Sequence, residues 1–324
     1  MKLNKNKKIL FLIILISLIV VIAVIVYIII KSNKSPKIIT ETISLNSLGT
    51  SALSVEIPEN VEINQEYSFV YIVKEGFLNE QIEKLIKDLN LDLELAEYFD
   101  TNYMEWEDGE NKFGYDSITN VLTFELAEPI FLGEKKEAFK TIFLKYFDES
   151  YDFTISKIDK INNDLTNYYA KRVLEDTPLE RGFGYEYTDI LRLDGNGYVR
   201  GGSLLLTEFE KKEGVLPIVT AEELIEYINL DLYPKESYVY ASHIMDTIGL
   251  SYLDPRWEEI HNSASNCKSG KIELIYLYKS VNQGYLYPIF KILANCDVEF
   301  ETEVYTVPAV FYVNAIQPDY VTVQ

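Results

Sequence analysis

The chain has 324 residues and a formal net charge of −21. This acidity, without any basic stripe to neutralise phosphates, argues against nucleic-acid binding. Hydrophobic residues make up 48% of the chain and include 25 Tyr and 16 Phe, which favours packed sheets over disorder.

The first predicted element is a membrane-spanning helix over residues 9–30, after a short cytoplasmic tail over residues 1–8. In "ILFLIILISLIVVIAVIVYIII", Ser17 is the only polar side chain apart from the hydroxyl of Tyr27. A helix of this length covers about 33 Å, enough to cross a bilayer core. A cleaved signal peptide is the alternative, but its apolar core is shorter and ends in small residues, whereas "KSNKSPK" follows here. A retained anchor is therefore favoured.

The lysines on either side of the span predict its orientation. Four precede it and three follow it in the juxtamembrane linker, residues 31–48, so the positive-inside bias favours a cytoplasmic N-terminus. The first 37 residues hold seven lysines and no acid, so the remainder is more acidic than the whole chain. An acidic domain is repelled by anionic cytoplasmic lipid. We therefore expect a single-pass plasma-membrane protein with an extracytoplasmic C-terminal domain.

Two stretches nearly repeat each other, "KEGFLNEQIEKLIKDLNLDL" at 74–93 and "KEGVLPIVTAEELIEYINLDL" at 212–232. In the second, Thr220 and Glu223 form a capping-box pattern that predicts a short helix beginning at Thr220. In the first, Asn79 is a suitable cap. The apolar residues that follow lie on one helical face in each copy; they are Ile82, Leu85, Ile86 and Leu89, then Leu224, Ile225 and Ile228.

Strand-like runs flank both copies and predict a duplicated unit. "YSFVYIV" and "GSLLLTEF" precede the repeats, and "NVLTFEL" and "KIELIYLY", each followed by "PIF", come after them. We expect an α+β fold with two related units of antiparallel sheet plus helix, over 49–160 and 183–324, joined by a polar connector over 161–182. Similar composition of short helices is the alternative explanation. A further helix is predicted over 134–147.

The second half resembles PepSY-like, cystatin-like modules and the YycH/YycI group of membrane-anchored regulators. The resemblance rests on the "DGNGYVRGG" hairpin, the "PIVTAEELIEYI" helix and the final "YLYPIFKI" and "VPAVFYVNAI" segments, and covers residues 183–316 plus the anchor. It implies a short cytoplasmic tail, one span and a tandem α+β ectodomain that modulates a partner sensor kinase. The first half matches only through the internal repeat, and the cysteine pair is not a feature of that group.

Cys267 and Cys296 are the only cysteines and flank a predicted hairpin that turns at Val281 and Asn282. With that turn, the two cysteines lie directly opposite each other, within disulfide range. A bond between them would indicate an oxidising compartment. Two buried thiols are the alternative.

Other chemistry-bearing residues form no recognisable site. His243 and His261 lack zinc-ligand spacing, so we expect no metal, and no cofactor-binding motif is present. "YMEWEDGE" places several acids around Trp106, as a glycosidase would need, but a solvated turn also explains them. These acids are Glu105, Glu107, Asp108 and Glu110.

Three functions remain open. The sequence favours a non-enzymatic membrane protein whose acidic ectodomain binds a protein partner, from the membrane or envelope, in a regulatory or scaffolding role. A carboxylate-dependent envelope hydrolase and a passive surface adhesion protein are the alternatives. No small-molecule ligand is indicated, and membrane lipid would contact residues 9–30.

Overall fold

The computed structural model describes Val21 and the following ranges: 36–40, 43–44, 53–58, 61–74, 82, 85–87, 94–95, 102–107, 110–133, 135–147, 151–182, 186–229, 235–239 and 263–322. The chain divides into two units, Met1–Ile38 and Ile39–Gln324. The expected span thus lies outside the described residues except for Val21. No helix within the described ranges is both long and apolar enough to cross a bilayer.

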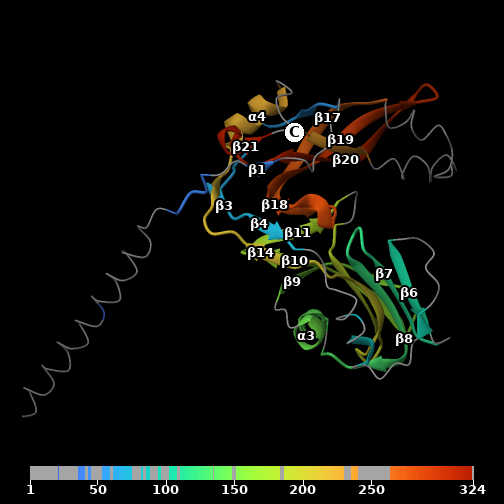
Figure 1. The fold of residues 1–324 in the computed structure, drawn as a ribbon. Coiled ribbons are helices and arrows are strands. Elements are labelled where there is room, and N and C mark those ends of the chain that lie inside the picture. The colour runs from blue at the N-terminus through green and yellow to red at the C-terminus, as the bar shows by residue number, and fades with distance from the viewer. Residues whose placement is uncertain are drawn as a thin grey trace, which may run out of the picture. The chain divides into compact units, whose positions relative to one another are not determined.

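The fold is mostly β, with one large mixed sheet and few short helices (Figure 1). One part of this sheet has the order β5-β6-β7-β8-β13-β12-β10, and β9 pairs with β10. Its strands are β5 (Glu94–Leu95), β6 (Tyr103–Glu107), β7 (Lys112–Asp116), β8 (Val121–Ile130), β9 (Asp152–Lys160), β10 (Leu165–Leu174), β12 (Asp189–Asp194) and β13 (Val199–Leu205).

One face of this part carries an apolar core because alternate strand residues point to the same side. Helix α3 (Lys136–Phe147) covers that face, as predicted over 134–147, and buries Phe139 and Phe143 against Phe153 of β9. From the first repeat copy, Ile82, Leu85 and Ile86 join the same core. Lys87 of the same predicted helix is exposed, and its remaining residues, including Asn79 and Leu89, lie outside the described ranges.

The other part of the sheet has the order β16-β20-β19-β17, with β2 pairing with β17. Its strands are β2 (Val55–Glu56), β16 (Lys235–Val239), β17 (Ala264–Tyr278), β19 (Pro288–Phe300) and β20 (Glu303–Asn314), and the short helix η1 (Val281–Gln283) lies between β17 and β19. Helix α4 (Ala221–Asn229) buries Leu224 and Ile228 in the core of this part.

The capping box predicted for α4 is confirmed. The backbone N–H of Thr220 donates to Glu223 Oε2 at 2.7 Å, and the backbone N–H of Glu223 donates to Thr220 Oγ1 at 3.2 Å. These reciprocal bonds satisfy donors that the first helical turn leaves without an intrahelical partner. The local sequence therefore determines where this helix begins.

The expected connector, 161–182, is not a linker. It contains all of β10, which follows a tight turn at Asn162, and all of β11 (Thr177–Arg181), which follows a second turn at Glu175 and Asp176. The polar residues that suggested a connector occupy the first of these turns and one sheet face. Strand β11 pairs antiparallel with β10 and then parallel with β17, so it joins the two parts of the sheet.

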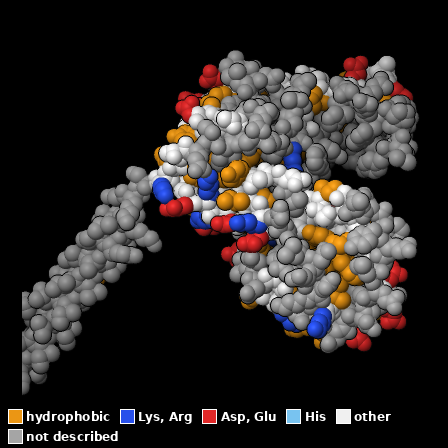
Figure 2. Space-filling view, in the orientation of Figure 1, with side chains coloured by type: hydrophobic (Ala, Val, Ile, Leu, Met, Phe, Trp, Pro, Cys, Tyr) orange, Lys and Arg blue, Asp and Glu red, His pale blue; other side chains and the backbone are white. Residues whose placement is uncertain are grey.

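Short strands surround this joint. They are β1 (Ile43–Ser44), β3 (Tyr67–Ser68), β4 (Tyr71–Val73), β14 (Phe209–Lys211), β15 (Leu216–Pro217), β18 (Tyr285–Leu286) and β21 (Val321–Thr322), with η2 (Pro318–Tyr320) before β21. Strands β14, β4 and β18 form one small sheet. Around β4 and β14, Figure 2 shows acidic and basic side chains next to one another, in keeping with the ion pairs of Lys74 with Glu210 and Lys211 with Glu175.

A buried carboxylate lies at the joint. Glu180 of β11 is fully buried and contacts Lys171 of β10 through one oxygen and Lys291 of β19, at 2.9 Å, through the other. Lys291 also contacts Glu186 Oε1 at 2.6 Å. Burial lowers the pKa of Lys291, but the two carboxylates outweigh this effect and the pKa is raised overall. Glu180 thereby links strands from both parts of the sheet through charge.

A second buried ion pair holds the α3-covered part together. Arg172 of β10 donates two hydrogen bonds to Asp189 of β12, both at 3.0 Å, and further bonds to the carbonyl oxygens of Leu205 and Thr207. Its guanidinium also lies 4.3 Å from the ring centroid of Phe143. Because each of the three guanidinium nitrogens donates at least one hydrogen bond and the carboxylate balances the charge, the ion pair is tolerated inside the core.

Buried tyrosines fill the joint beside β4. The hydroxyl of Tyr276 contacts Ser68 Oγ at 3.0 Å and donates to the carbonyl oxygen of Phe69, and Thr207 Oγ1 donates to the hydroxyl of Tyr278 at 2.9 Å. Burial raises the pKa of Tyr71, Tyr276 and Tyr278. These phenols therefore hold their protons at pH values where exposed tyrosines lose them.

We expect Glu180→Ala to lower the free energy of unfolding by about 3–5 kcal/mol, because it leaves the charge of the buried Lys291 partly uncompensated. Glu175→Ala is the matched control, since Glu175 lies in the same β10–β11 hairpin and forms an exposed ion pair worth about 1 kcal/mol or less. Denaturant unfolding of both variants checks this. Equal losses in the two would contradict the role of Glu180.

Stability should fall as the pH rises above about 10. The unfolded chain then loses phenol protons that the folded chain retains, so it binds fewer protons and becomes favoured. Tyr276→Phe removes one such group and should flatten the fall between about pH 10 and 12. Thermal unfolding across this range measures the effect, with Tyr198→Phe, on an exposed turn, as the control that should follow the parent chain.

Candidate binding surface

An open hollow of about 490 Å³ lies on the sheet face opposite α3. It crosses β7, β8, β13, β12 and β10, and its volume is within the range of sites for small ligands or short peptide segments. At one end of the same face, Val121 and Leu205 are buried against the joint. The hollow begins where that apolar packing ends.

The strand register places the side chains of the hollow in two rows across the sheet. One row runs Gly114, Thr123, Ser203, Ile190 and Tyr169, and the other runs Lys112, Glu125, Gly201, Arg192 and Asn167. Neighbours within a row are opposite one another on adjacent strands, where side chains interact directly. The floor is therefore a continuous surface built from five strands, with polar side chains around Ile190 and the glycines.

Two glycines on this face of the sheet allow neighbouring groups to approach the backbone closely. The hydroxyl of Tyr103 of β6 occupies the space that a side chain at Gly114 would need. A side chain at Gly201 would come within 2.6 Å of the Phe124 carbonyl oxygen on the adjacent strand. A glycine inside a strand often marks such a close approach. At Gly114 the Tyr103 hydroxyl therefore takes the place of a side chain, and at Gly201 the adjacent strand lies too close to admit one.

Arg192 is held in position from two sides. Its Nη1 donates to Glu125 Oε1 at 3.0 Å, and its Nε approaches Asn167 Oδ1 at 3.4 Å. A guanidinium carries five N–H donors, so further donors are available for a bound molecule. An arginine restrained in this way loses little side-chain freedom on binding.

Positive and negative groups nearly balance around the hollow. Lys112 lies 2.5 Å from Glu105 and 3.8 Å from Glu107, and Arg192 pairs with Glu125. Because the acids slightly outnumber the bases, the surface disfavours a phosphate or another strong anion. A polypeptide segment, with alternating donors and acceptors, matches the lining better.

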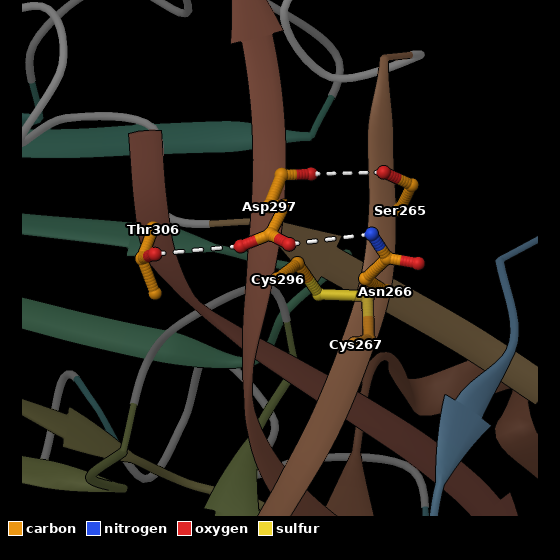
Figure 3. The surroundings of a disulfide bond; sticks show 6 residues. All are labelled: Ser265, Asn266, Cys267, Cys296, Asp297 and Thr306. Atoms are coloured by element: carbon orange, nitrogen blue, oxygen red, sulfur yellow. Dashed lines mark hydrogen bonds between the residues drawn. A yellow bond between two sulfur atoms is a disulfide. The ribbon is translucent and has the colours of Figure 1, made fainter. Parts of the chain in front are cut away.

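The predicted disulfide is present. Cys267 of β17 and Cys296 of β19 are bonded, with their Cα atoms 3.9 Å apart, and both are buried (Figure 3). Next to them, Lys268 pairs with Asn295, which is the register that the sequence predicted for the cysteines themselves. The hairpin interpretation of 267–296 is therefore confirmed at the cysteine pair.

Polar contacts around Asp297 brace the same end of the hairpin. Asn266 Nδ2 donates to one carboxylate oxygen of Asp297 at 3.3 Å, and Thr306 Oγ1 donates to the other at 3.4 Å. Ser265 Oγ donates to the carbonyl oxygen of Asp297. Figure 3 shows these groups beside the disulfide, joining β17, β19 and β20. These contacts and the disulfide cross-link three strands at this end of the sheet.

The other sequence candidates do not gather into a site. Trp106 is buried in the core, so it is no platform for a sugar, and Glu105 and Glu107 pair with Lys112. Asp108, His243 and His261 lie outside the described residues. Within the described part of the chain, no group of three or more His, Cys, Asp or Glu is placed to hold a metal ion.

The residues of the hollow were not predicted as a site. They come from strands scattered between Lys112 and Ser203, and no short motif connects them. The only local signal was the glycine pair at 201 and 202 inside a strand-like run, which indicates close backbone approach. Recognising the site requires the strand order.

Comparisons with known proteins supply no family. No protein-family model matches the chain, and no curated protein matches it. Among solved structures, it is similar to the crystal structure of an uncharacterized protein from Eubacterium rectale ATCC 33656, with 11% sequence identity and a TM-score of 0.44. The match covers 83% of this chain and 90% of that one.

Replacing both cysteines with serine should lower the free energy of unfolding by about 3–4 kcal/mol, because the bond closes a loop of about 30 residues in the unfolded chain. Guanidinium unfolding of parent and variant measures this. A reductant should destabilise the parent by a similar amount and leave the Cys267→Ser, Cys296→Ser variant unaffected. Parent stability that is insensitive to reductant would contradict the structural role of the bond.

Proposed function

We propose that this chain is a non-enzymatic, single-pass membrane protein whose extracytoplasmic domain binds a protein partner in a regulatory or scaffolding role. The observation that carries the proposal is the polar hollow with its restrained Arg192. Its nearly balanced charges and open floor suit an extended polypeptide segment that lies across β7, β8, β13, β12 and β10. Proteins that read peptides commonly combine backbone contacts with a few fixed polar groups.

The proposed location rests on two independent features. The apolar run over 9–30 is long enough for an anchor. The bond between Cys267 and Cys296 suits an oxidising exterior, because such bonds are rare in reducing compartments. Both features support a domain that works outside the cytoplasm.

We further propose that the domain consists of two related units. The repeats at Lys74 and Lys212 are offset by 138 residues in the sequence. In the β4–β14 ladder, Ile72 pairs with Glu210, which is its equivalent at that same offset. The equivalent strands thus pair around a local two-fold centre, as expected if one duplicated unit pairs with the other.

The hydrogen bonds beside this ladder repeat in the same way. The backbone N–H of Lys74 donates to the carbonyl of Glu208 at 3.1 Å, and that of Lys212 donates to the carbonyl of Val70 at 2.9 Å. The two parts also differ, since β5 pairs with its sequence neighbour β6 whereas β16 pairs with the distant β20. The second "PIF" segment lies at the beginning of β19. In the first "PIF" segment, by contrast, Pro129 and Ile130 are the last residues of β8. The proposal therefore concerns the repeated segments at 74–93 and 212–232, each with the strand that precedes it and the helix that it contains.

The resemblance to the YycH/YycI group suggests the kind of partner. A sensor kinase exposes an extracytoplasmic domain close to the membrane, where an anchored regulator meets it at high effective concentration.

A hydrolase is less well supported. A hydrolase needs an acid whose pKa is raised. At Glu186 burial would raise the pKa, but Lys291 outweighs this effect and the pKa is lowered. At Asp152 the hydrogen bond and charge of Lys140 lower the pKa as well. A passive adhesion protein would bind without altering a signalling output.

A photo-crosslinking amino acid at Ile190, in the floor of the hollow, tests the proposal in native membranes. We expect a discrete protein adduct from position 190 and none from Leu144, an exposed position on α3. Arg192→Glu should reduce the adduct by about tenfold or more, because truncating a charged contact at an interface costs at least 2 kcal/mol. Lys136→Glu, at an exposed α3 lysine, is the matched charge control and should leave it unchanged.

Two results would count against the proposal. One is adduct formation at equal yield from Ile190 and Leu144, which would indicate chance proximity. The other is an adduct that persists in Arg192→Glu, which would remove the hollow as the binding surface.

A further inference from the structure

The outer strand β9 has properties that the proposed partner site does not use. Among the described residues, β9 pairs with β10 alone, so its other edge presents backbone donors and acceptors along nine residues. Figure 1 shows β9 at the outer side of the sheet above α3. An edge of this length is a template for adding another strand.

The side chains of β9 also face solvent to an unusual extent. Ile158 is 55% exposed, and Ile161, just past the strand, is 48% exposed. On the other face of the strand, Lys157 and Asp159 form an ion pair at 2.6 Å. A partner strand would cover Ile158 on one face and meet Lys157 and Asp159 on the other.

We propose that β9 pairs antiparallel with β9 of a second copy of this chain, centred on Ile158. In this register Ile158 faces its own equivalent, and the paired segment lies wholly beyond the bulge beside Ile155. Lys157 then faces Asp159 on both sides of the two-fold axis, which gives two complementary charge pairs. The interface is isologous, so no further open edge is created and assembly stops at the dimer.

Charge selects this register over its neighbours. Shifting the two-fold centre by one residue toward the N-terminus places Lys157 opposite its own equivalent, and shifting it the other way does the same for Asp159. Like charges directly opposite one another destabilise a strand pair. A centre at Ser156 pairs only the strand ends, Asp152 with Lys160, and brings the bulge beside Ile155 into the middle of the interface.

The bulge and the lysines have a second consequence. They are features that protect edge strands against indiscriminate pairing. In β9 the bulge restricts regular pairing to residues after Ile155, the same segment that carries the complementary charges. The strand therefore favours one self-complementary register. A single strand pair buries less than a standard interface of about 1,600 Å², so the dimer should form reversibly with concentration.

Cysteine crosslinking tests the register directly. Full-length Ile158→Cys in detergent micelles should form an intermolecular disulfide under mild oxidation, since paired Cα atoms lie within about 4.5–5.5 Å. Leu144→Cys, equally exposed on α3, is the control and should remain uncrosslinked. No dimer from Ile158→Cys, or equal dimer from both, would overturn the proposal.

A charge swap provides the second test, read by analytical ultracentrifugation. Lys157→Asp and Asp159→Lys, each alone, should weaken self-association by about tenfold, because each places like charges opposite one another twice. The double variant restores both pairs and should recover the parent association constant. Equal association in all four forms would contradict β9 pairing, including the case in which dimers form through the anchor alone. Thermal unfolding of the variants shows whether the monomer itself is intact.

Discussion

The Glu180 carboxylate is the contact on which the continuity of the large sheet depends. Strand β11 joins the two parts of the sheet through only two paired residues with β10 and three with β17. So few backbone bonds would hold the joint weakly, yet Glu180 takes a lysine from each side, Lys171 from β10 and Lys291 from β19. Such a pair stabilises only because both ends are satisfied, since an unpaired buried charge costs several kcal/mol. The placement of β11 between β10 and β17 follows from this contact.

What the sequence predicted well was local. The capping box at Thr220 and Glu223 predicted the start of α4, and the apolar spacing over 134–147 predicted α3. The pairing of Cys267 with Cys296 followed from a single hairpin, because its two strands are adjacent in the chain. In each case the interacting residues lie within one element or across one turn, so composition and spacing contain the necessary information.

What the sequence did not predict was long-range. The polarity of 161–182 suggested a linker, but these residues form β10 and β11, and their burial comes from distant partners such as Asp189 for Arg172. Local propensity cannot reveal a strand whose stability depends on packing against other parts of the sheet. The hollow follows the same rule, because Lys112 and Asn167 lie close together only after five strands assume their order. A candidate site without a motif is visible only through topology.

The pairing of β4 with β14 bears on why a repeated segment would have diverged so far on either side. If two copies of one unit meet around Ile72 and Glu210, the backbone course of the two strands must remain alike there, even though the side chains differ. The sheets beyond it would then be free to change, and the two parts do differ: one has α3 and the open hollow, the other has a disulfide and long strands. Under the proposed binding role, the part with the disulfide keeps its contacts to the joint and the part with the hollow binds the partner. Division of labour of this kind follows when a duplicated unit keeps its interface and relaxes constraint elsewhere.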